Sequence, residues 1–507
     1  MLGIENAIPT GSLHYLPAVV PVLILVLGGV AIVLMRALNR DVEVVSPVSM
    51  LIAMTAAFGA AAGLVLQWNE TGLKKGGPYI AFSSTVIVDR FGVFLAMLVC
   101  IALVLVLLLS SGFLMRADVP APEYIAMMLF SAAGMVTMAS ANDLLVVFIA
   151  LELLSIPLYV LAAFDRKRRE SQEAGLKYFV LGALASAIFL YGAALVYGTT
   201  GTTHIFTATG NSIATSYANP LESAAPLFLI GAGLVIVGFA FKVAAAPFHM
   251  WTPDVYQGAP TPVTAFMASA TKVAGFTALM RLLFVAFGAN ASDWKPVVAT
   301  LAVLSLVVGA VAALVQTDIK RILAYSSIAN AGYVFVALTA GPSGIRAALV
   351  YLAVYTLMII GTLAVVSLVA GPDDDHTLTR YRGLSRRHPY LAGALAFFLL
   401  AQAGVPFTAG FIAKLAVFKA AIDGKVYWLA VLGMLVAAIA AFYYLRIIVT
   451  MYMANDDEPE AEIERASALV RWTAGPVIVV TAALVLFIGF FPNWLFDLAA
   501  RALVKLG

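Results

Sequence analysis

Four ionisable side chains lie deep inside apolar stretches of this 507-residue sequence. They are Glu152, Lys242, Lys272 and Lys414, and none of them stands at the end of its stretch. A charged side chain at the centre of a bilayer costs roughly 2.5–3.5 kcal/mol on insertion scales, and such residues commonly mark ion or proton pathways. We therefore take these four residues as candidate proton carriers.

The elements that must position them are membrane helices. The sequence is 63% hydrophobic and only 11% charged, which no soluble domain of this length matches. Apolar stretches of about 20 residues, the length that spans a bilayer, predict an all-α membrane protein with about fourteen transmembrane helices. The expected spans centre on Leu16–Met35, Pro47–Leu66, Gly92–Leu109, Ile125–Ala139, Leu144–Phe164, Gly175–Tyr197, Leu227–Ala246, Pro262–Phe287, Val297–Val315, Ile322–Leu338, Ala347–Val369, Tyr390–Phe418, Val426–Met451 and Pro476–Phe491.

Composition argues against bound cofactors and nucleic acid. The net charge is +3 without a basic patch, and Cys100 is the only cysteine, so a cysteine-ligated iron–sulfur cluster within this chain is excluded. The five histidines are scattered, and no phosphate-binding glycine loop occurs. We expect neither a cofactor nor a metal in this chain.

The distribution of basic residues predicts the orientation. No lysine or arginine precedes Arg36, so the first span is expected to be retained, with its start outside. The alternating inner segments then hold about sixteen Lys and Arg and the outer ones about seven, as the positive-inside rule requires. Fourteen spans place both termini outside. High alanine content and the lack of a transit peptide favour a bacterial plasma membrane.

Two of the expected spans are interrupted. The seventh contains Pro247 shortly after Lys242, and the twelfth contains Gly404 and Pro406 shortly before Lys414. Either interruption alone is compatible with a simple proline kink. Together they lie five spans apart, an odd number, which makes the second copy run opposite to the first and predicts an inverted repeat with an ion site near the midplane.

This repeat divides the single membrane domain of residues 1–507. The expected parts are three N-terminal helices (1–120), a first five-helix repeat in spans 4–8 (121–290), a second in spans 9–13 (291–452) and a C-terminal helix (453–507).

Glu152 and Lys242 fall in the same predicted repeat and are expected partners. Ser155 and Tyr159 share the helical face of Glu152, so that face is expected to point inward. A neighbouring carboxylate favours the charged lysine and desolvation the neutral one, which would make Lys242 switchable. The alternative is a static buried ion pair.

Lys272 has no acid on its own expected helix. Burial disfavours the charged form of an unpaired lysine, so Lys272 is expected to carry protons rather than to hold helices together, and its distance from both ends of the span weakens the snorkelling alternative. Lys414 lies near the second interruption, where half-helix ends offer partial charges and free backbone groups.

Two further residues are weaker candidates. Lys177 is either a path residue or part of the basic belt at the inner surface, and His249 is either a relay group near neutral pH or a satisfied polar residue.

Several motifs resemble one known family. The run PFHMWTPDVYQGAPTPV (247–263) closely resembles subunit N of respiratory complex I, the NADH–quinone oxidoreductase. LELLSIPL around Glu152, KRILAYSS (320–327) and GVPFTAGFIAK ending at Lys414 fit the same pattern. The resemblance covers most of the chain. Lys414 argues against the M-type subunit, which has glutamate there, and the chain's end near Leu506 argues against the L-type, which carries a long lateral helix.

The resemblance implies a function. Glu152 and Lys242 would form the switching pair of one half-channel, Lys272 would be the central carrier, and Lys414 would serve the other half-channel. Quinone reduction elsewhere in the complex would supply the energy. NADH, FMN, quinone and the iron–sulfur clusters would bind to other subunits, and the partners would be other membrane subunits, including neighbouring antiporter-like ones. Asn330 departs from the pattern, because many relatives carry histidine there; water or another route must then join Lys272 to Lys414, and Tyr333 is a neighbouring candidate.

Two alternatives remain open at this stage. A subunit of a Mrp-type cation/proton antiporter shares the fold and the charges, and a structural membrane subunit would carry them without pumping.

Overall fold

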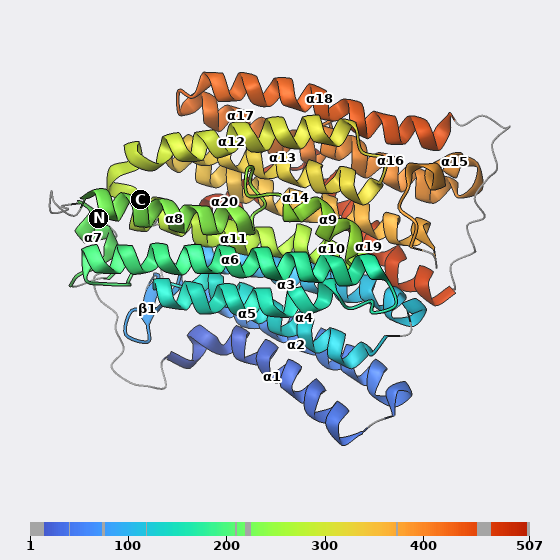
Figure 1. Cartoon of the computed structure of the whole chain (residues 1–507), viewed down its shortest axis with the longest axis horizontal. Helices are drawn as coiled ribbons and strands as arrows, with labels where there is room; N and C mark the ends of the chain where they lie inside the picture. Colours follow the sequence, from blue (N-terminus) through green and yellow to red (C-terminus); the bar gives the residue numbers. More distant parts are fainter. Residues whose placement is uncertain are drawn as a thin grey trace.

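A bundle of long, nearly parallel helices makes up the computed structural model of the chain, which describes residues 15–39, 41–72, 77–117, 119–207, 210–218, 225–371, 374–453 and 468–503 (Figure 1). The helices are α1 (Leu16–Leu38), α2 (Val42–Glu70), α3 (Arg90–Ala117), α4 (Ala121–Ser140), α5 (Leu144–Ala162), α6 (Arg169–Thr200), α7 (Ile213–Ala218), α8 (Ala225–Lys242), α9 (Trp251–Gly258), α10 (Thr261–Ala268), α11 (Ala270–Arg281), α12 (Ala291–Leu314), α13 (Ile319–Thr339), α14 (Pro342–Ala370), α15 (Leu384–Arg387), α16 (Pro389–Ala403), α17 (Ala409–Asp423), α18 (Tyr427–Tyr452), α19 (Ala468–Phe490) and α20 (Asn493–Leu503). A short antiparallel hairpin pairs β1 (Tyr79–Ala81) with β2 (Val86–Val88).

The membrane-spanning helices confirm the predicted fold class. Within the described ranges, thirteen helices are long and apolar enough to cross a bilayer. The expected twelfth span consists of two shorter helices, α16 and α17, on either side of an interruption. The start of α1 and the end of α20 lie at the same end of the bundle (Figure 1), as an even number of crossings requires. We call this end, which also carries the hairpin, the α20 end, and the opposite one the α15 end.

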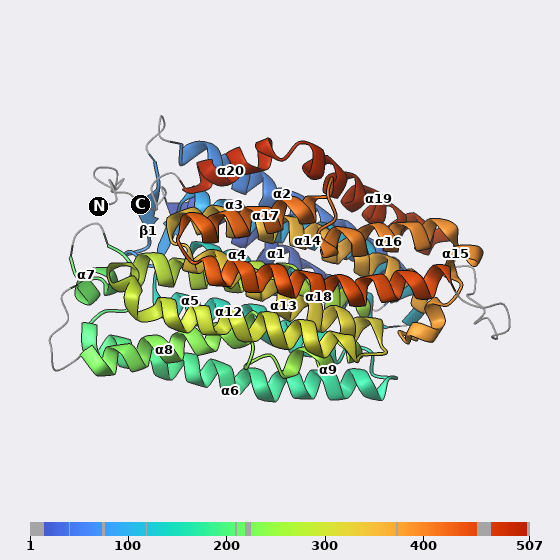
Figure 2. The same cartoon turned by 90° about the horizontal axis from the view of Figure 1, so that it is seen from above.

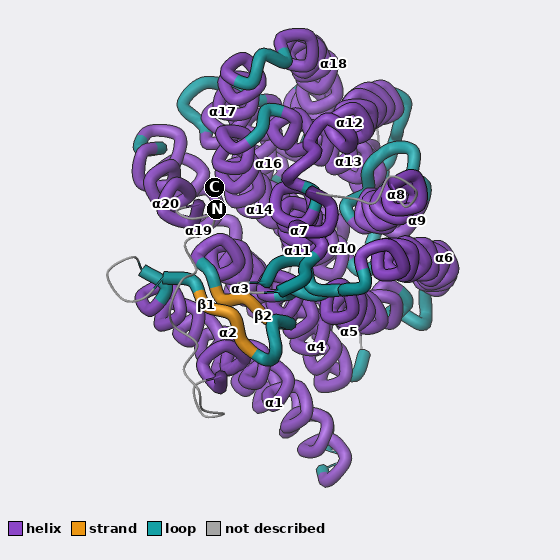
Figure 3. Tube along the Cα trace, turned by 90° about the vertical axis from the view of Figure 1, so that its left-hand side faces the viewer, coloured by secondary structure: helices purple, strands orange, loops and turns teal. Residues whose placement is uncertain are grey.

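The centre of the bundle is formed by α10, α11, α13 and α14, which the other helices surround (Figures 2 and 3). The apolar length of α14 is completely buried and that of α13 almost so. Small residues allow the close approach of α12 to α13: a Cβ at Gly309 would lie 2.5 Å from the backbone nitrogen of Ala329. These central helices carry Lys272 and Asn330.

The observed helix ends correct two expected spans. The seventh was expected to run to Ala246, but α8 ends at Lys242, so this lysine is the last residue of a half-helix. The eighth was expected to be continuous, but it breaks at Ser269 (φ −104°, ψ −83°) into α10 and α11. Ser269 directly precedes α11, whose first turn bears Lys272. Neither proline nor glycine stands at this break, so it could not be predicted from the sequence.

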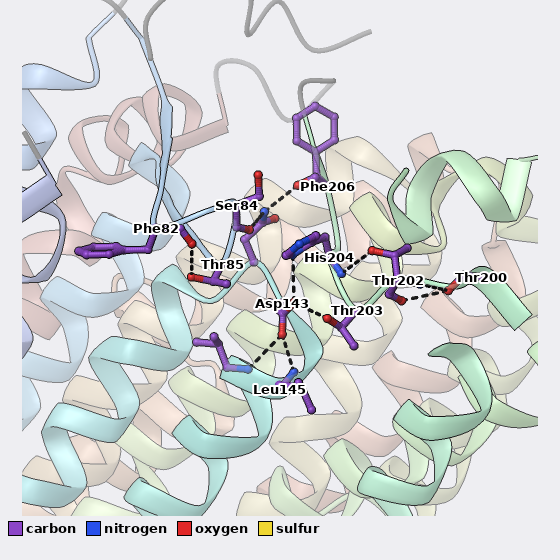
Figure 4. Close-up of polar contacts among 12 residues, drawn as sticks. Phe82, Ser84, Thr85, Asp143, Leu145, Thr200, Thr202, Thr203, His204 and Phe206 are labelled. Carbon is purple, nitrogen blue, oxygen red and sulfur yellow. Dashed lines mark hydrogen bonds and ion pairs between the residues drawn. The ribbon is translucent and has the colours of Figure 1, made fainter. Parts of the chain in front are cut away.

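Matching contacts occur at the two ends of the bundle. At the α20 end, Asp143 caps α5 by accepting from the Leu145 amide at 2.8 Å, and its backbone forms an isolated antiparallel bridge with His204, just after α6 (Figure 4). At the α15 end, Asp318 caps α13, and its backbone pairs in the same way with Thr377, after α14. This correspondence of the fifth and sixth spans with the tenth and eleventh is what an inverted repeat produces. The repeat boundaries stay a prediction.

A buried ion pair anchors the second half of the eighth span. Arg281, 2% exposed at the end of α11, binds both carboxylate oxygens of Asp89 at 2.7 and 3.0 Å and the carbonyl of Ala139 at 3.0 Å. Asp89 also caps α3, accepting from the Gly92 amide at 2.7 Å. The pair therefore joins α11, α3 and the end of α4.

Replacing Arg281 by methionine should destabilise the protein by about 3–5 kcal/mol, because it leaves the buried Asp89 carboxylate unpaired. Thermal unfolding of the purified protein measures the loss. The double variant with Asp89→Asn keeps the helix cap but removes the charge, and should recover most of the stability. A double variant as unstable as the single one would show that charge burial is not the cause.

Candidate proton-transfer site

Lys242 occupies the first helix break. Its side chain is buried, and Nζ donates to Ser155 Oγ at 2.7 Å and to Tyr178 Oη at 3.3 Å. The chain leaves α8 immediately after Lys242 and re-enters helix at Trp251, whose indole donates to the Phe241 carbonyl at 3.0 Å. A fixed lysine at a half-helix end can exchange a proton with hydroxyl groups beside it.

Glu152 lies one helical turn from Ser155 and makes no direct ion pair with Lys242 among the described residues. Its Oε1 is buried without a hydrogen-bond partner. Ser155 Oγ takes the place of the expected carboxylate contact because it lies closer to the end of α8. The predicted switching role of the pair stays a prediction.

Lys272 lies at the centre of the bundle, 2% exposed. Its Nζ donates to the backbone carbonyl of Ser327 and lies 5.7 Å from the centre of the Tyr355 ring. The Tyr355 hydroxyl donates in turn to Ser327 Oγ at 2.8 Å. Lys272 thus has no acidic partner in the described part of the chain, as expected from the sequence.

Lys414 binds the C-terminal end of α16. Its Nζ donates to the carbonyls of Gln402 and Ala403, each at 2.9 Å, which are the last two residues of that helix. Nζ also lies 5.3 Å from the centre of the Tyr333 ring. The half-helix end therefore supplies the partial negative charge that the sequence predicted beside this lysine.

A nearly continuous line of polar groups joins the Lys272 and Lys414 regions. Ser326 directly precedes Ser327 on α13, and its hydroxyl lies 2.5 Å from Tyr444 Oη. Tyr444 Oη donates to Gln402 Oε1 at 3.4 Å, and Gln402 holds Lys414 through its carbonyl. Asn330 donates to the Ser326 carbonyl at 2.8 Å and accepts from Tyr351 Oη at 2.6 Å. Asparagine thus orients this line, although it does not itself titrate.

Aromatic rings occupy the gap between Lys242 and Lys272. Tyr178 stacks on Trp251 with ring centres 4.5 Å apart, and Trp251 meets Tyr256 edge-on at 6.1 Å. The Tyr256 hydroxyl is buried without a hydrogen-bond partner. More direct hydrogen bonds between protein groups therefore lie between Lys272 and Lys414 than between Lys272 and Lys242.

The two weaker candidates lie outside this row. Lys177, whose side chain is 41% exposed, pairs with Glu173 at 2.6 Å and with Asp254 at 2.7 Å, and Asp254 also binds Arg321 at 2.7 Å. This cluster at the surface favours the interpretation of Lys177 as part of the basic belt. His249 is half-buried, its Nδ1 has no hydrogen-bond partner, and its ring lies 6.5 Å from that of Tyr325. The roles of both residues stay predictions.

Sequence reasoning missed one buried cation. Lys320 was placed among the basic residues of an inner loop, but it is fully buried, and its Nζ donates to the Ala259 carbonyl at 2.6 Å, at the end of α9. Its position next to the start of α13 gave no signal of burial. No group of three or more His, Cys, Asp or Glu side chains suited to a metal occurs in the described ranges.

His376 lies beside this lysine, in the connection after α14, and is 3% exposed. Burial, together with the positive charge of Lys320, lowers the pKa of its imidazole well below the ordinary value of 6.5, against the weaker opposing effect of Asp318. Burial outweighs the Asp374 carboxylate, whose Oδ1 lies 3.0 Å from His376 Nε2, so the folded state favours the neutral imidazole. Its stabilising contribution is complete above pH 6.5 and is lost as the pH falls below that value, where only the unfolded segment takes up a proton.

Opening of the segment around His376 should accordingly become about tenfold more frequent at pH 5.5 than at pH 7.5. The factor arises because pH 5.5 lies one unit below the pKa of the unfolded imidazole, and it corresponds to ~1.4 kcal/mol. Hydrogen exchange by mass spectrometry, corrected for intrinsic rates, measures the change. The His376→Asn variant should lose this pH dependence. An unchanged dependence in that variant would assign it to other groups.

The comparisons with known proteins agree with this geometry. The family model for the NADH:quinone oxidoreductase/Mrp antiporter transmembrane family matches residues 141–440. The chain is 40% identical to NADH-quinone oxidoreductase subunit N 1 of Solibacter usitatus over 98% of both proteins, and 41% identical to subunit N of Rhodospirillum rubrum over 96% of both.

Solved structures show the same fold. A chain of the respiratory complex I of Thermus thermophilus with bound aureothin is 34% identical, covers 95% of this chain and 99% of its own length, and superposes with a TM-score of 0.77. A chain of the Mrp complex of Dietzia has a TM-score of 0.80 at 19% identity over 98% of both chains, which shows the fold alone. With its buried lysines, its broken helices and these relatives, the chain belongs to the NADH:quinone oxidoreductase/Mrp antiporter family and, within it, to the subunit N group of the NADH-quinone oxidoreductases.

Proposed function

We propose that this chain is a proton-translocating membrane subunit of an NADH–quinone oxidoreductase. The observation that carries the proposal is the row of three buried lysines beside helix breaks: Lys242 at the end of α8, Lys272 in the first turn of α11, and Lys414 in the second turn of α17, with its Nζ on the last carbonyls of α16. Purely structural helices would gain little from three such costly groups.

In this proposal the groups act in sequence. A change in the charge or position of Glu152 alters how strongly Lys242 holds its proton, with Ser155 Oγ as the contact between the two regions. Lys272 takes up the proton at the centre and passes it toward Lys414 along Ser326, Tyr444 and Gln402. Water must complete the steps where hydrogen bonds are missing, above all between Lys242 and Lys272.

The proposed setting follows from the relatives' names. Other membrane subunits, including neighbouring antiporter-like ones, would be the partners, and quinone reduction elsewhere in the complex would drive the translocation. NADH, FMN, quinone and iron–sulfur clusters would belong to other subunits. The location proposed is the bacterial plasma membrane. The α15 end would face the cytoplasm, because it carries the clustered basic residues, and both termini would lie outside.

The second candidate is a subunit of a Mrp-type cation/proton antiporter. The family model covers both kinds of protein, and the Mrp chain of Dietzia shares the fold. The identity to subunit N over almost the whole chain favours the first candidate. A non-pumping structural subunit is the third candidate, and variants of the lysines distinguish it.

The decisive experiment purifies the chain with its partners in mild detergent, measures NADH oxidation with quinone, and then measures proton pumping in liposomes. We expect redox subunits in the preparation and pumping that depends on Lys272. Lys272→Ala should remove most pumping, whereas Lys419→Ala, at an exposed position on α17, should leave it unchanged. Sodium-dependent proton exchange without NADH oxidation would favour the antiporter, and full pumping by Lys272→Ala would favour the structural subunit.

Gln402 provides a separate test of the route between Lys272 and Lys414. Gln402→Leu removes the side-chain contact with Tyr444 but keeps the carbonyl that binds Lys414. Pumping should fall about tenfold, which corresponds to ~1.4 kcal/mol on the barrier. Gln67→Leu is the matched control, since Gln67 is also a buried glutamine but bonds to carbonyls of α1. Equal pumping by the two variants would mean that protons take another route.

A further inference from the structure

An apolar cavity of about 390 Å³ lies at the side of the bundle, away from the lysine row. Its walls come from α2, α3, α14, α19 and α20 and include Trp68, Phe94, Met97, Leu357, Ile488 and Trp494. Apolar side chains provide almost all of this lining. An engineered apolar cavity of roughly 150 Å³ already binds benzene, so this one is large enough for a substantial apolar group.

The cavity is continuous with the surface that faces lipid. Several of its lining residues are well exposed on the outside of the bundle, among them Val65 (50%), Trp494 (43%) and Ile101 (38%). Along α3 it extends from Val93 to Ile101, which is ~12 Å of helix at 1.5 Å per residue. Half of the hydrocarbon core of a bilayer measures ~15 Å. The cavity therefore spans most of the depth of one leaflet, starting from the α20 end.

A cation lies next to this cavity, against the Trp68 ring that forms part of its lining. Arg90 begins α3 and lies over the Trp68 ring at 4.9 Å, and its Nε donates to the Trp68 carbonyl at 3.2 Å. Within the described residues, no carboxylate lies within 4.0 Å of its guanidinium nitrogens. Trp68 and Trp494 are placed like the aromatic residues that mark the membrane interface. The site thus combines an unpaired positive charge at the surface with an apolar slot below it.

We propose that this cavity binds a phospholipid, with one acyl chain between α3, α14 and α20 and the phosphate at Arg90. Arginine is well suited to phosphate through paired N–H donors. The α20 helix is amphipathic, and its buried side consists of Leu495, Ala499 and Ala502, so the acyl chain would fill the space that this helix leaves open against α3 and α14. The proposal is independent of proton transfer.

Cryo-electron microscopy of the complete assembly tests this, in nanodiscs of phosphatidylglycerol and phosphatidylethanolamine. We expect unbranched density that starts at Arg90 and continues down the cavity. Ala353→Phe fills the cavity from α14 and should remove this density. Leu184→Phe, at a lipid-exposed position on α6, should leave it unchanged. An empty cavity in the unaltered protein, or ring-shaped density beside the Thr356 hydroxyl as an isoprenoid quinone would give, would overturn the proposal.

Arg90→Gln tests the phosphate without changing the cavity. The density at the head-group position should be lost, while the control Arg346→Gln, at an exposed arginine of the α20 end, should retain it. If Ala353→Phe prevents assembly, the Arg90 variant decides alone: unchanged head-group density would show that Arg90 does not bind the lipid.

Discussion

Every backbone carbonyl that a helix break frees inside a membrane needs a donor, and this requirement organises the interior of the protein. Lipid offers no hydrogen-bond partner, so an unsatisfied backbone group that water does not reach is costly. Lys414 donates to the last two carbonyls of α16, Lys272 to a carbonyl of α13, and Lys320 to the carbonyl that follows α9. Lys414 and Lys320 thus satisfy carbonyls at helix ends as well as supplying charge, whereas Lys272 bonds to a carbonyl within the continuous helix α13.

This dual use explains why charge and irregular backbone occur together. A lysine held by carbonyls at a half-helix end sits in a fixed place and keeps a proton that neighbouring hydroxyls can reach. The hydroxyl groups are present: Ser155 beside Lys242, Tyr355 near Lys272, and Tyr444 in the line toward Lys414. The atoms that the proposed function uses for proton exchange are therefore also atoms that pack the interior.

The rest of the bundle holds these breaks in register. Asp143 and Asp318 cap α5 and α13 at opposite ends of the bundle. The backbone of each aspartate also pairs with the connection that follows the next span. The Arg281–Asp89 pair fixes α11 to α3. These anchors lie at the ends of their helices, and the Arg281–Asp89 pair is itself buried.

The sequence by itself determined the fold class, the number of crossings and the identity of the charged row. Bilayer thickness sets the length of an apolar span, and proline or glycine marks a break, so both signals are local. Tertiary structure alone decided the contacts. Ser155 rather than Glu152 touches Lys242, a break without proline precedes Lys272, and Lys320 is buried beneath the end of α9. Each depends on how distant helices pack, because a side chain's burial and partners come from neighbours that are far away in the sequence.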